Sequence, residues 1–445
     1  MGISVFIDQV LELLMGWPLI MYVIAISALC TVAFKCIQIT NFFTSIKNTF
    51  TPSISQEKST DADMTPFQAF MNSLNSAIGN GSIGGVAVAI AVGGPGAVFW
   101  IVIVGLLLMA MRFAEIYLTT YFGPKKMGGA ILGGPMVYLH HVIGGRYLAY
   151  IYALFCVFFG FIGGSAIQTN TIGLSVSTTW GIPAWINAVM LTVFVAYIVL
   201  GGASRIIQAS MRIVPVKVVV FFVSSLTILA YHHQSLVSAL QLIVKSAFSP
   251  VAVAGGLMGF TIQQAMRAGI NAVVFATEAG IGTAAIVYGG SESKEPIADS
   301  IGSMLGVFIS TTVCFLVAMC IIASGVWNSG LTSTALTVAA YNSTFSWFGG
   351  WLVTFLSTTF GMGVLVTYAY ITRAVWLYLT GGKGQRIFTV LYCLFAFMGA
   401  LLKVDMLWKL TDITNVLLLI VNLFGIVMLL PLIVRGIAAY HSEKR

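Results

Sequence analysis

Charged residues are scarce in this chain of 445 residues, because Asp, Glu, Lys and Arg together make up only 8% of it. Soluble domains carry about 25% of such residues, so a soluble fold is excluded. The mean hydropathy is +0.99, and 59% of the residues are hydrophobic. The apolar runs are long and continuous, which is typical of membrane-spanning helices and not of a membrane barrel. We therefore expect an all-α integral membrane protein.

Residues that bind metals or act as nucleophiles are also few. The six cysteines lie within apolar segments and none of them forms a C-x-x-C pair, so we interpret them as small buried residues. The pairs His140-His141 and His232-His233 lie at predicted helix ends, where solvation at the membrane interface explains them. The sequence contains no nucleophile–base arrangement and no phosphate-binding loop. We expect neither enzyme activity nor a cofactor nor a metal cluster.

The hydropathy pattern predicts eleven membrane spans within a single transmembrane domain that covers residues 1–445. Several spans exceed the ~20 residues that a straight crossing needs, so they must tilt, break or extend beyond the bilayer. The longest polar connection, from Asn48 to Thr65, lies between the first two spans. The predicted spans are residues 17–36, 66–92, 97–122, 147–174, 183–201, 212–231, 252–288, 297–323, 349–379, 387–402 and 412–434.

The distribution of Lys and Arg predicts the orientation of the chain in the membrane. If the N-terminus lies outside, only Lys245, Lys403 and Lys409 fall on the outer side. The C-terminus is then cytoplasmic. The net charge of +8 has no aromatic-basic surface beside it, so nucleic acid is not an expected partner. The basic residues on the cytoplasmic side are Lys35, Lys47, Lys58, Lys125, Lys126, Arg146, Arg205, Arg212, Lys217, Lys294, Arg373, Lys383, Arg386, Arg435, Lys444 and Arg445.

A glycine cluster interrupts the second span. Four of the seven residues from Gly79 to Gly85 are glycines, and each costs up to ~1 kcal/mol in a helix relative to alanine. Inside a membrane, the backbone groups that such a break frees must face protein, water or a bound solute. Here they would lie beside Asn80 and Ser82, an arrangement with which transporters hold a small zwitterion and its coupling ion. The alternative is close packing between helices, which small residues also allow.

A second interruption is predicted in the seventh span. Its polar middle, Q-Q-A-M-R-A-G-I-N, contains Gly269 and is followed by residues 277–282. If the helix at 17–36 is an extra helix, the two interrupted spans open two sets of five spans, at residues 66–231 and 252–434. Paired interruptions at corresponding positions indicate an inverted repeat with a binding site near the middle of the membrane.

Charged residues within the predicted spans include Arg112, Glu115, Arg267 and Glu278. Each would be costly if it faced lipid, so each should face the helix bundle and find a partner. Arg112 and Glu115 are three positions apart on one helix, and we expect them to pair with each other. Arg267 and Glu278 flank the second interruption, where they would brace or gate the unwound segment. Glu278 is also a candidate proton carrier.

Polar side chains gather midway along the apolar fourth span, in the sequence G-G-S-A-I-Q-T-N. Gln168 and Asn170 in this stretch are candidates to contact the ammonium or carboxylate group of a ligand. The alternative for both side chains is hydrogen bonding between helices.

The ninth span offers three adjacent hydroxyl groups, on Ser357, Thr358 and Thr359. Together with Ala77 and Asn80 of the second span, they are candidate oxygen donors for a small cation. The alternative is that these hydroxyls bond to the backbone of their own helix, as Ser and Thr commonly do in membrane helices.

Five stretches of the sequence form a recognisable set of motifs. They are G-N-G-S-I-G-G-V at 79–86 followed by G-G-P-G-A-V-F-W at 93–100, R-F-A-E at 112–115, G-G-P-M-V-Y at 133–138 and F-A-T-E-A-G-I-G at 275–282. Together they resemble motifs of the alanine or glycine:cation symporter family. The resemblance extends from about Thr65 to Trp327, and more loosely to the C-terminus.

The resemblance implies the leucine-transporter (LeuT) fold, in which two inverted repeats of five helices follow one extra helix and work by alternating access. It also implies sodium-coupled uptake of a small neutral amino acid such as alanine or glycine. The chain departs from the usual residues of the family at Asn80, Ser82, Ser310 and Met362-Gly363. The substrate and the coupling ion therefore stay open.

We predict a secondary transporter of the plasma (inner) membrane that imports a small neutral amino acid with a monovalent cation, most simply sodium. The alternatives are a proton-coupled carrier or a carrier of another solute with the same fold, and a non-transporting sensor. The oligomeric state is not predicted. The residues expected to contact the substrate are Gly79, Asn80, Gly81, Ser82, Gln168, Gly269 and, as an apolar cover, Phe275.

Overall fold

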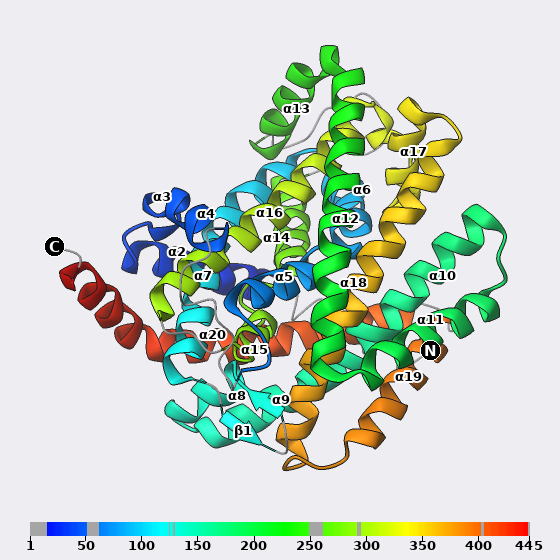
Figure 1. Cartoon of the computed structure of the whole chain (residues 1–445). Coiled ribbons are helices and arrows are strands. Elements are labelled where there is room, and N and C mark those ends of the chain that lie inside the picture. Colours follow the sequence, from blue (N-terminus) through cyan, green and yellow to red (C-terminus); the bar gives the residue numbers. More distant parts are fainter. Residues whose placement is uncertain are drawn as a thin grey trace.

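The computed structural model describes residues 16–50, 62–123, 125–127, 130–248, 261–291, 295–401 and 405–443. These residues form a helical fold in which segments far apart in the sequence pack side by side (Figure 1). A short hairpin, formed by β1 (Lys125–Met127) and the antiparallel β2 (Ala130–Leu132), accompanies the helices. The predicted all-α class is therefore confirmed.

Within the described residues, six helices are long and apolar enough to cross a membrane. A seventh crossing is added if α5 (Pro66–Ala77) and the bent continuation formed by η2 (Gly81–Gly85) and α6 (Val86–Gly93) count as one span. The chain is thus a multi-pass membrane protein. The six helices are α7 (Gly96–Phe122), α9 (Gly145–Phe161) continued through η4 (Ile162–Ala166) into α10 (Ile167–Trp180), α12 (Gly202–Tyr231), α16 (Pro296–Ala323), α18 (Phe348–Leu379) and α20 (Asp405–Glu443).

The other predicted spans correspond to shorter helices. These are α2 (Trp17–Ala33), α11 (Ala184–Leu200) and α19 (Gln385–Leu401), and the pair α14 (Ile262–Thr277) and α15 (Thr283–Tyr288). The start of the predicted span 252–288, most of the polar connection after Asn48, and Lys58, Lys294, Lys403, Lys444 and Arg445 lie outside the described residues. The total of eleven spans stays a prediction. The remaining helices are α3 (Ile37–Thr40), α4 (Phe42–Phe50), α8 (Pro135–Tyr138), η3 (Leu139–His141), η5 (His233–Ser235), α13 (Leu236–Phe248), η6 (Val326–Asn328) and α17 (Ser333–Phe345).

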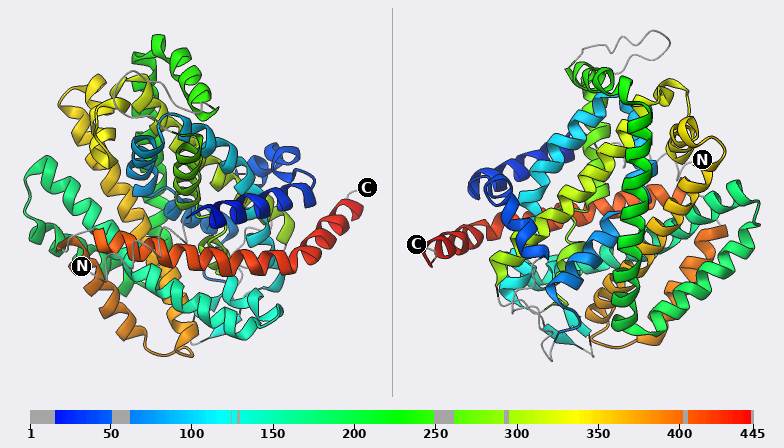
Figure 2. Two further views of the ribbon diagram at one scale, coloured as in Figure 1. Left: turned by 180° about the vertical axis from the view of Figure 1, so that it is seen from behind. Right: turned by 45° about the horizontal axis from the view of Figure 1, so that its top comes forward.

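The long helices pack in two groups. In the first group α7 packs against α14 and α16, and α14 also packs against α6. In the second group α10 packs against α18 and α19, α11 against α19, and α9 against α18. The helices α5 and α12 both contact α18, so the first interrupted span lies where the groups meet. Figure 2 shows α20, in red, running across the bundle at a wide angle to α12, in green.

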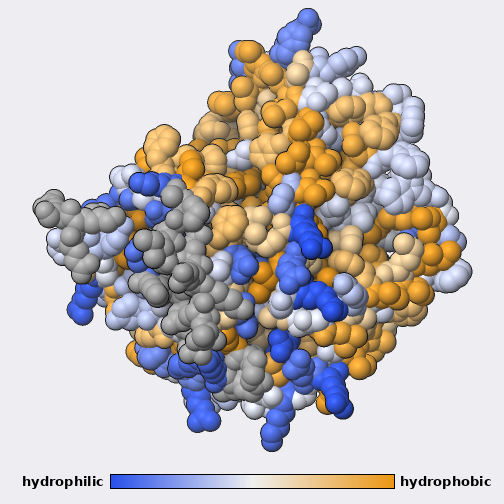
Figure 3. All heavy atoms as spheres, viewed as in Figure 1, coloured by the Kyte–Doolittle hydropathy of each residue, from blue (hydrophilic) through white to orange (hydrophobic). Residues whose placement is uncertain are grey.

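The surface of α12 shows how the helices meet lipid. Val216, Val219, Val223 and Leu226 are exposed and recur every three or four residues, so they form one apolar stripe along the helix. Figure 3 shows apolar side chains gathered over the upper part of the face that α12 crosses, and hydrophilic side chains toward the lower edge. An apolar stripe of this kind is the surface that a bilayer covers.

Gly269 lies inside the regular helix α14, and its predicted place in an unwound segment is wrong. A Cβ atom at this position would lie 2.3 Å from the carbonyl oxygen of Ala97 in α7. The missing side chain therefore lets α14 approach α7 closely, which is the packing role that small residues have in membrane helices. The polar residues before Gly269 belong to the first turns of α14, where Thr261 and Gln264 form a capping box.

This packing predicts opposite effects of one substitution at two helical glycines. Gly269→Ala should lower stability by about 1–3 kcal/mol, because its Cβ would overlap the backbone of α7. Gly173→Ala in α10, whose Cβ would meet its nearest atom at 3.8 Å, should leave stability unchanged or raise it by up to ~1 kcal/mol through helix propensity. The apparent melting temperature of each purified variant in detergent measures the difference. Equal melting temperatures would contradict the packing role.

Candidate substrate and cation site

The first helix break lies where the glycine cluster predicts it. The helix α5 starts with a capping box between Thr65 and Gln68 and ends at Ala77, where the amide of Ile78 still bonds to Leu74. The chain then continues as the π-helix η2 and as α6, at an angle of 48° to α5. Short π-helical segments are frequent at functional sites. The predicted interruption of the second span is confirmed.

The carbonyl groups that this break frees have side-chain partners from other helices. The Lys217 Nζ atom of α12 donates hydrogen bonds to the carbonyl oxygens of Asn75 at 2.9 Å and Ile78 at 2.8 Å. The Ser310 hydroxyl of α16 donates to the carbonyl oxygen of Ala77 at 3.3 Å. Because Ala77, a candidate cation ligand, already accepts this bond, its carbonyl oxygen is held toward α16.

Asn80, Gln168 and Ser357, all predicted site residues, lie together beside the break. The Asn80 Nδ2 atom donates to Gln168 Oε1 at 3.3 Å, and the Ser357 hydroxyl donates to Asn80 Oδ1 at 2.9 Å. Gln168 follows the π-helix η4 and donates to the carbonyl oxygen of Gly163 within it at 3.1 Å. A Cβ at Gly361 would lie 2.8 Å from Asn80 Nδ2, so this glycine leaves room for the Asn80 amide.

The glycines of the break differ in their surroundings. A Cβ at Gly79 would lie 2.7 Å from Val364, so Gly79 permits close packing against α18. A Cβ at Gly81 or at Gly85 would meet no atom within 4 Å. Ser82 is fully buried in η2, and its amide donates to the carbonyl oxygen of Gly79 at 3.0 Å. Open space therefore lies beside Gly81, the residue that follows Asn80.

The second helix break spans residues 278–282, between α14 and α15. Glu278, Gly280 and Gly282 all have positive φ values, of 53°, 90° and 91°. This backbone conformation suits glycine and is strained for glutamate. The Glu278 carboxylate accepts hydrogen bonds from the Tyr368 hydroxyl at 2.7 Å and the Thr283 hydroxyl at 2.9 Å. These bonds hold Glu278 in its strained conformation, and its predicted position at the break is confirmed.

Side chains from three helices satisfy the carbonyl groups of the second break. Arg112 Nη2 donates to the carbonyl oxygen of Thr277 at 2.6 Å, Asn422 Nδ2 to that of Gly280 at 2.8 Å, and the Tyr152 hydroxyl to that of Ile281 at 2.8 Å. Because its carbonyls are occupied in this way, the second break is braced from α7, α9 and α20.

The predicted pair of Arg112 and Glu115 is confirmed, with 3.7 Å between Arg112 Nε and Glu115 Oε2. Asn422 Nδ2 donates to Glu115 Oε1 at 2.8 Å and so connects this ion pair to the second break. The Tyr138 hydroxyl donates in turn to Asn422 Oδ1. Arg267 lies elsewhere, half-buried in α14 and ten residues before the helix ends at Thr277. The expectation that Arg267 flanks the break is wrong, because the helix stays regular through Gly269.

Phe275, the predicted apolar cover of the substrate, lies half-buried on α14. With Ile270, Asn271 and Val274 it forms a helical stripe on α14 that lines a small hollow. The opposite wall of this hollow is formed by α2 and α20. Phe275 thus lies toward these two helices, and its role as an apolar cover of the substrate stays a prediction.

Asn170 and Thr359 have the ordinary roles that were the alternatives to ligand contact. The Asn170 amide donates to the carbonyl oxygen of Gly399 at 2.7 Å and so joins two helices. The Thr359 hydroxyl donates to the carbonyl oxygen of Phe355 in its own helix at 3.0 Å. Thr358 is half-buried on α18, one residue beyond the hydroxyl that reaches Asn80.

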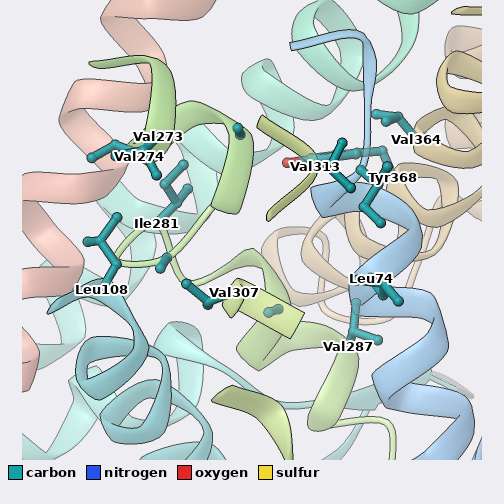
Figure 4. Packing of buried hydrophobic residues seen from close by; sticks show 14 of the residues in the cluster. Leu74, Leu108, Val273, Val274, Ile281, Val287, Val307, Val313, Val364 and Tyr368 are labelled. Carbon is teal, nitrogen blue, oxygen red and sulfur yellow. The ribbon is translucent and has the colours of Figure 1, made fainter. Parts of the chain in front are cut away.

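The helix α18 and Ser310 connect the two breaks. Ser357 on α18 contacts Asn80 at the first break, and Tyr368 on α18 contacts Glu278 at the second. The Ser310 hydroxyl also lies 2.8 Å from the carbonyl oxygen of Ala276, at the end of α14. Figure 4 shows Tyr368 and Val364 of α18 in the apolar core that also contains Leu74 of α5. The two breaks therefore share contacts through α18 and Ser310.

Lys217 is the residue of this site that sequence reasoning missed. It was counted among the cytoplasmic loop residues, yet the structure buries it completely inside α12. The signal was present, because position 217 falls within the predicted span 212–231, where a charge should face the bundle and find a partner.

The chain is similar to proteins of known families along nearly its whole length. The profile of the Sodium:alanine symporter family matches residues 2–445. The sodium/alanine symporter AgcS of Methanococcus maripaludis is 31% identical over 399 residues, which cover 88% of this chain and 87% of that protein. The probable sodium/glutamine symporter GlnT of Bacillus subtilis is 31% identical over 388 residues, which cover 86% and 80%.

A solved structure of a Na⁺-coupled sialic acid symporter has a similar fold. It superposes with a TM-score of 0.54, covers 87% of this chain and 82% of its own, and is 11% identical in sequence. At this identity the likeness concerns the arrangement of helices alone.

The bracing of the second break makes a prediction about stability. Arg112→Leu should destabilise the protein by about 3–5 kcal/mol, because it leaves the buried Glu115 carboxylate and the Thr277 carbonyl without their cation. Arg267→Leu is the matched control, since Arg267 is half-buried and lies away from the break. The apparent melting temperature and the yield of monodisperse protein in detergent would show the difference. Equal losses for both variants would show that Arg112 does not brace the segment.

Proposed function

This chain belongs to the sodium:alanine symporter family, which consists of transporters and not of enzymes, and we propose that it imports a small neutral amino acid. Transport would be secondary and active, driven by a cation gradient. Its partners would be the amino acid, a monovalent cation and the surrounding lipid. The names of its relatives, a sodium/alanine and a probable sodium/glutamine symporter, support this class of substrate.

The observation that carries the proposal is the group of Asn80, Gln168 and Ser357 beside the open space at Gly81. The half-helix formed by η2 and α6 begins at Gly81, and the positive end of its dipole favours the carboxylate of an amino acid. The amide and hydroxyl oxygens of Gln168, Asn80 and Ser357 favour its ammonium group. A zwitterion would thus satisfy both kinds of group at one place.

The space available favours a small side chain. Gly79 already packs against Val364, and Gly361 packs against Asn80, so the walls of the site on the side of α18 are close. Ser82, buried in η2, adds another wall. A substrate of the size of alanine or glycine fits this restriction better than a bulky amino acid does.

Two candidates remain for the coupling cation. Sodium is supported by the names of the relatives, and the oxygens of Ala77, Asn80, Ser357, Thr358 and Thr359 are the donors proposed for it. Asn80 and Ser357 are the best placed of these, because their side chains already meet at the first break. A proton is the second candidate, because Glu278 and Lys217 are ionisable groups buried at the two breaks.

We further propose the architecture that the pattern of spans indicates. An extra helix at 17–36 would precede two inverted repeats of five spans, 66–231 and 252–434, as in the LeuT fold. The protein would lie in the plasma (inner) membrane, with its N-terminus outside and its C-terminus in the cytoplasm. The two groups of packed helices support alternating access, since movement of one against the other would open the breaks to either side.

Uptake into proteoliposomes tests the proposal. We expect a screen of amino acids to find counterflow and accumulation of a small neutral amino acid. A sodium gradient at constant pH, compared with a pH gradient at equal sodium, would identify the cation that drives accumulation. A sensor would bind the amino acid without counterflow, and lack of counterflow for every amino acid would contradict the proposed function.

A size series at Gly81 tests the position of the substrate. Gly81→Ala should retain uptake, whereas Gly81→Leu should abolish it, because the longer side chain would fill the space beside Asn80 while the membrane helices still form. Val88→Leu on the exposed face of α6 adds bulk outside this space and is the control. Cell-surface expression and uptake are measured for all three variants. Full uptake by Gly81→Leu would exclude the glycine cluster from the mechanism.

A further inference from the structure

The ammonium group of Lys217 lies at the end of the broken helix α5. It is fully buried and makes its two hydrogen bonds with the carbonyl oxygens of Asn75 and Ile78. In an unbroken helix these oxygens would accept bonds from the amides four residues later. For Ile78 the break removes that partner, since the amide of Ser82 bonds to Gly79 instead. Lys217 has taken the place of this missing helical amide.

Two groups near the Lys217 Nζ atom attract a positive charge and so offset part of the cost of burying it. The C-terminal end of a helix carries a partial negative charge, and Lys217 lies at this end of α5. The Nζ atom also lies 5.5 Å from the ring centroid of Phe360, where the face of the ring attracts a cation. Carbonyl oxygens at the end of a broken helix are also the groups with which transporters bind monovalent coupling ions.

Gly363 on α18 provides the room that the ammonium group needs. A Cβ at this position would lie 2.8 Å from Lys217 Nζ and 2.2 Å from Asn75 Oδ1. Any side chain there would compete with the Lys217 ammonium group for the position lined by the carbonyl oxygens of Asn75 and Ile78. Lys217 on α12 therefore needs a glycine at position 363 of α18, because a larger residue would occupy the space of its ammonium group.

We propose that the ammonium group of Lys217 is a tethered cation, which occupies the position lined by the freed carbonyl oxygens at the first break. During transport this position then holds a proton carried by Lys217 and not a free metal ion. The inference rests on the proposed function as a cation-coupled carrier. The Nζ atom takes up a proton from the side to which the site is open. It releases that proton to water on the other side, so one proton crosses in each cycle.

Other titratable groups face this part of α12. Glu278 is the charged group that interacts electrostatically with Lys217, and it lies at the second break, where it can respond to the loss of the lysine charge. The helix α5 contributes no ionisable side chain. The other titratable side chains with printed contacts to α12 lie farther along it: the Tyr341 hydroxyl of α17 bonds to Ser225, the Cys320 thiol of α16 to the carbonyl oxygen of Ser225, and Arg205 lies over the ring of Tyr197 of α11.

Uptake driven by a pH gradient tests the proposal. Proteoliposomes hold equal sodium concentrations on both sides, an alkaline interior and radiolabelled alanine outside. The unmodified protein should accumulate alanine. Lys217→Met keeps the length of the side chain without its charge, and should reduce accumulation by about tenfold, a factor within the usual range for coupling between two sites. Lys245→Met, a control at an exposed lysine of α13, should leave accumulation unchanged.

Counterflow of alanine under the same conditions, without any gradient, separates coupling from binding. The ratio of pH-driven accumulation to counterflow should fall about tenfold for Lys217→Met, because this ratio compares coupling at equal alanine exchange. Full pH-driven accumulation by Lys217→Met would overturn the inference. So would an unmodified protein that responds only to a sodium gradient, although the proposed function would then stand. Lack of counterflow in the unmodified protein would instead remove the proposed function, and this inference with it.

A second pair of variants decides the question if Lys217→Met does not fold. Gly363→Ala keeps the lysine but crowds its ammonium group, and should lower pH-driven accumulation. Gly306→Ala in α16, whose Cβ would meet its nearest atom at 3.8 Å, should not. Equal accumulation by these two variants would overturn the inference.

Discussion

The fold depends on one constraint, which is that a backbone group released from a helix inside a membrane must find another partner. This chain releases such groups at two places. At the first break Lys217 and Ser310 bond to the freed carbonyl oxygens. At the second break Arg112, Asn422 and Tyr152 do so. The donors come from α7, α9, α12, α16 and α20, so the breaks determine which residues these helices must carry at their points of contact.

The same contacts make the two breaks interdependent. Ser310 bonds to the last turns of both α5 and α14, and α18 meets the first break through Ser357 and the second through Tyr368. A movement of α5 or α14 relative to α18 must therefore exchange several hydrogen bonds together. Small changes of this kind are amplified into discrete states because packed interfaces have few alternative arrangements. A solute that bonds to Asn80 would act on this shared network.

Local sequence chemistry predicted the first break and the Arg112–Glu115 pair, because glycine clusters and i,i+3 charges act within one helix. The second break was predicted correctly at residues 277–282 but wrongly extended to Gly269. Polar residues at the capped start of a helix resemble those of an unwound middle when no tertiary contact is known. Lys217 was misassigned for a related reason. The direction of a side chain depends on the helices packed around it, and hydropathy does not report that direction.

A tethered cation and a free ion stabilise a broken helix in different ways. A free ion occupies its carbonyl oxygens according to its concentration on each side of the membrane. A lysine is always present, so the occupancy depends on its protonation and on whether its side chain can reach the oxygens. That reach depends on one neighbouring position, since Gly363 leaves the space that Lys217 fills. Two side chains can thus change which cation serves this position while the surrounding helices keep their arrangement. Membership of a family therefore predicts the fold more securely than it predicts the coupling ion.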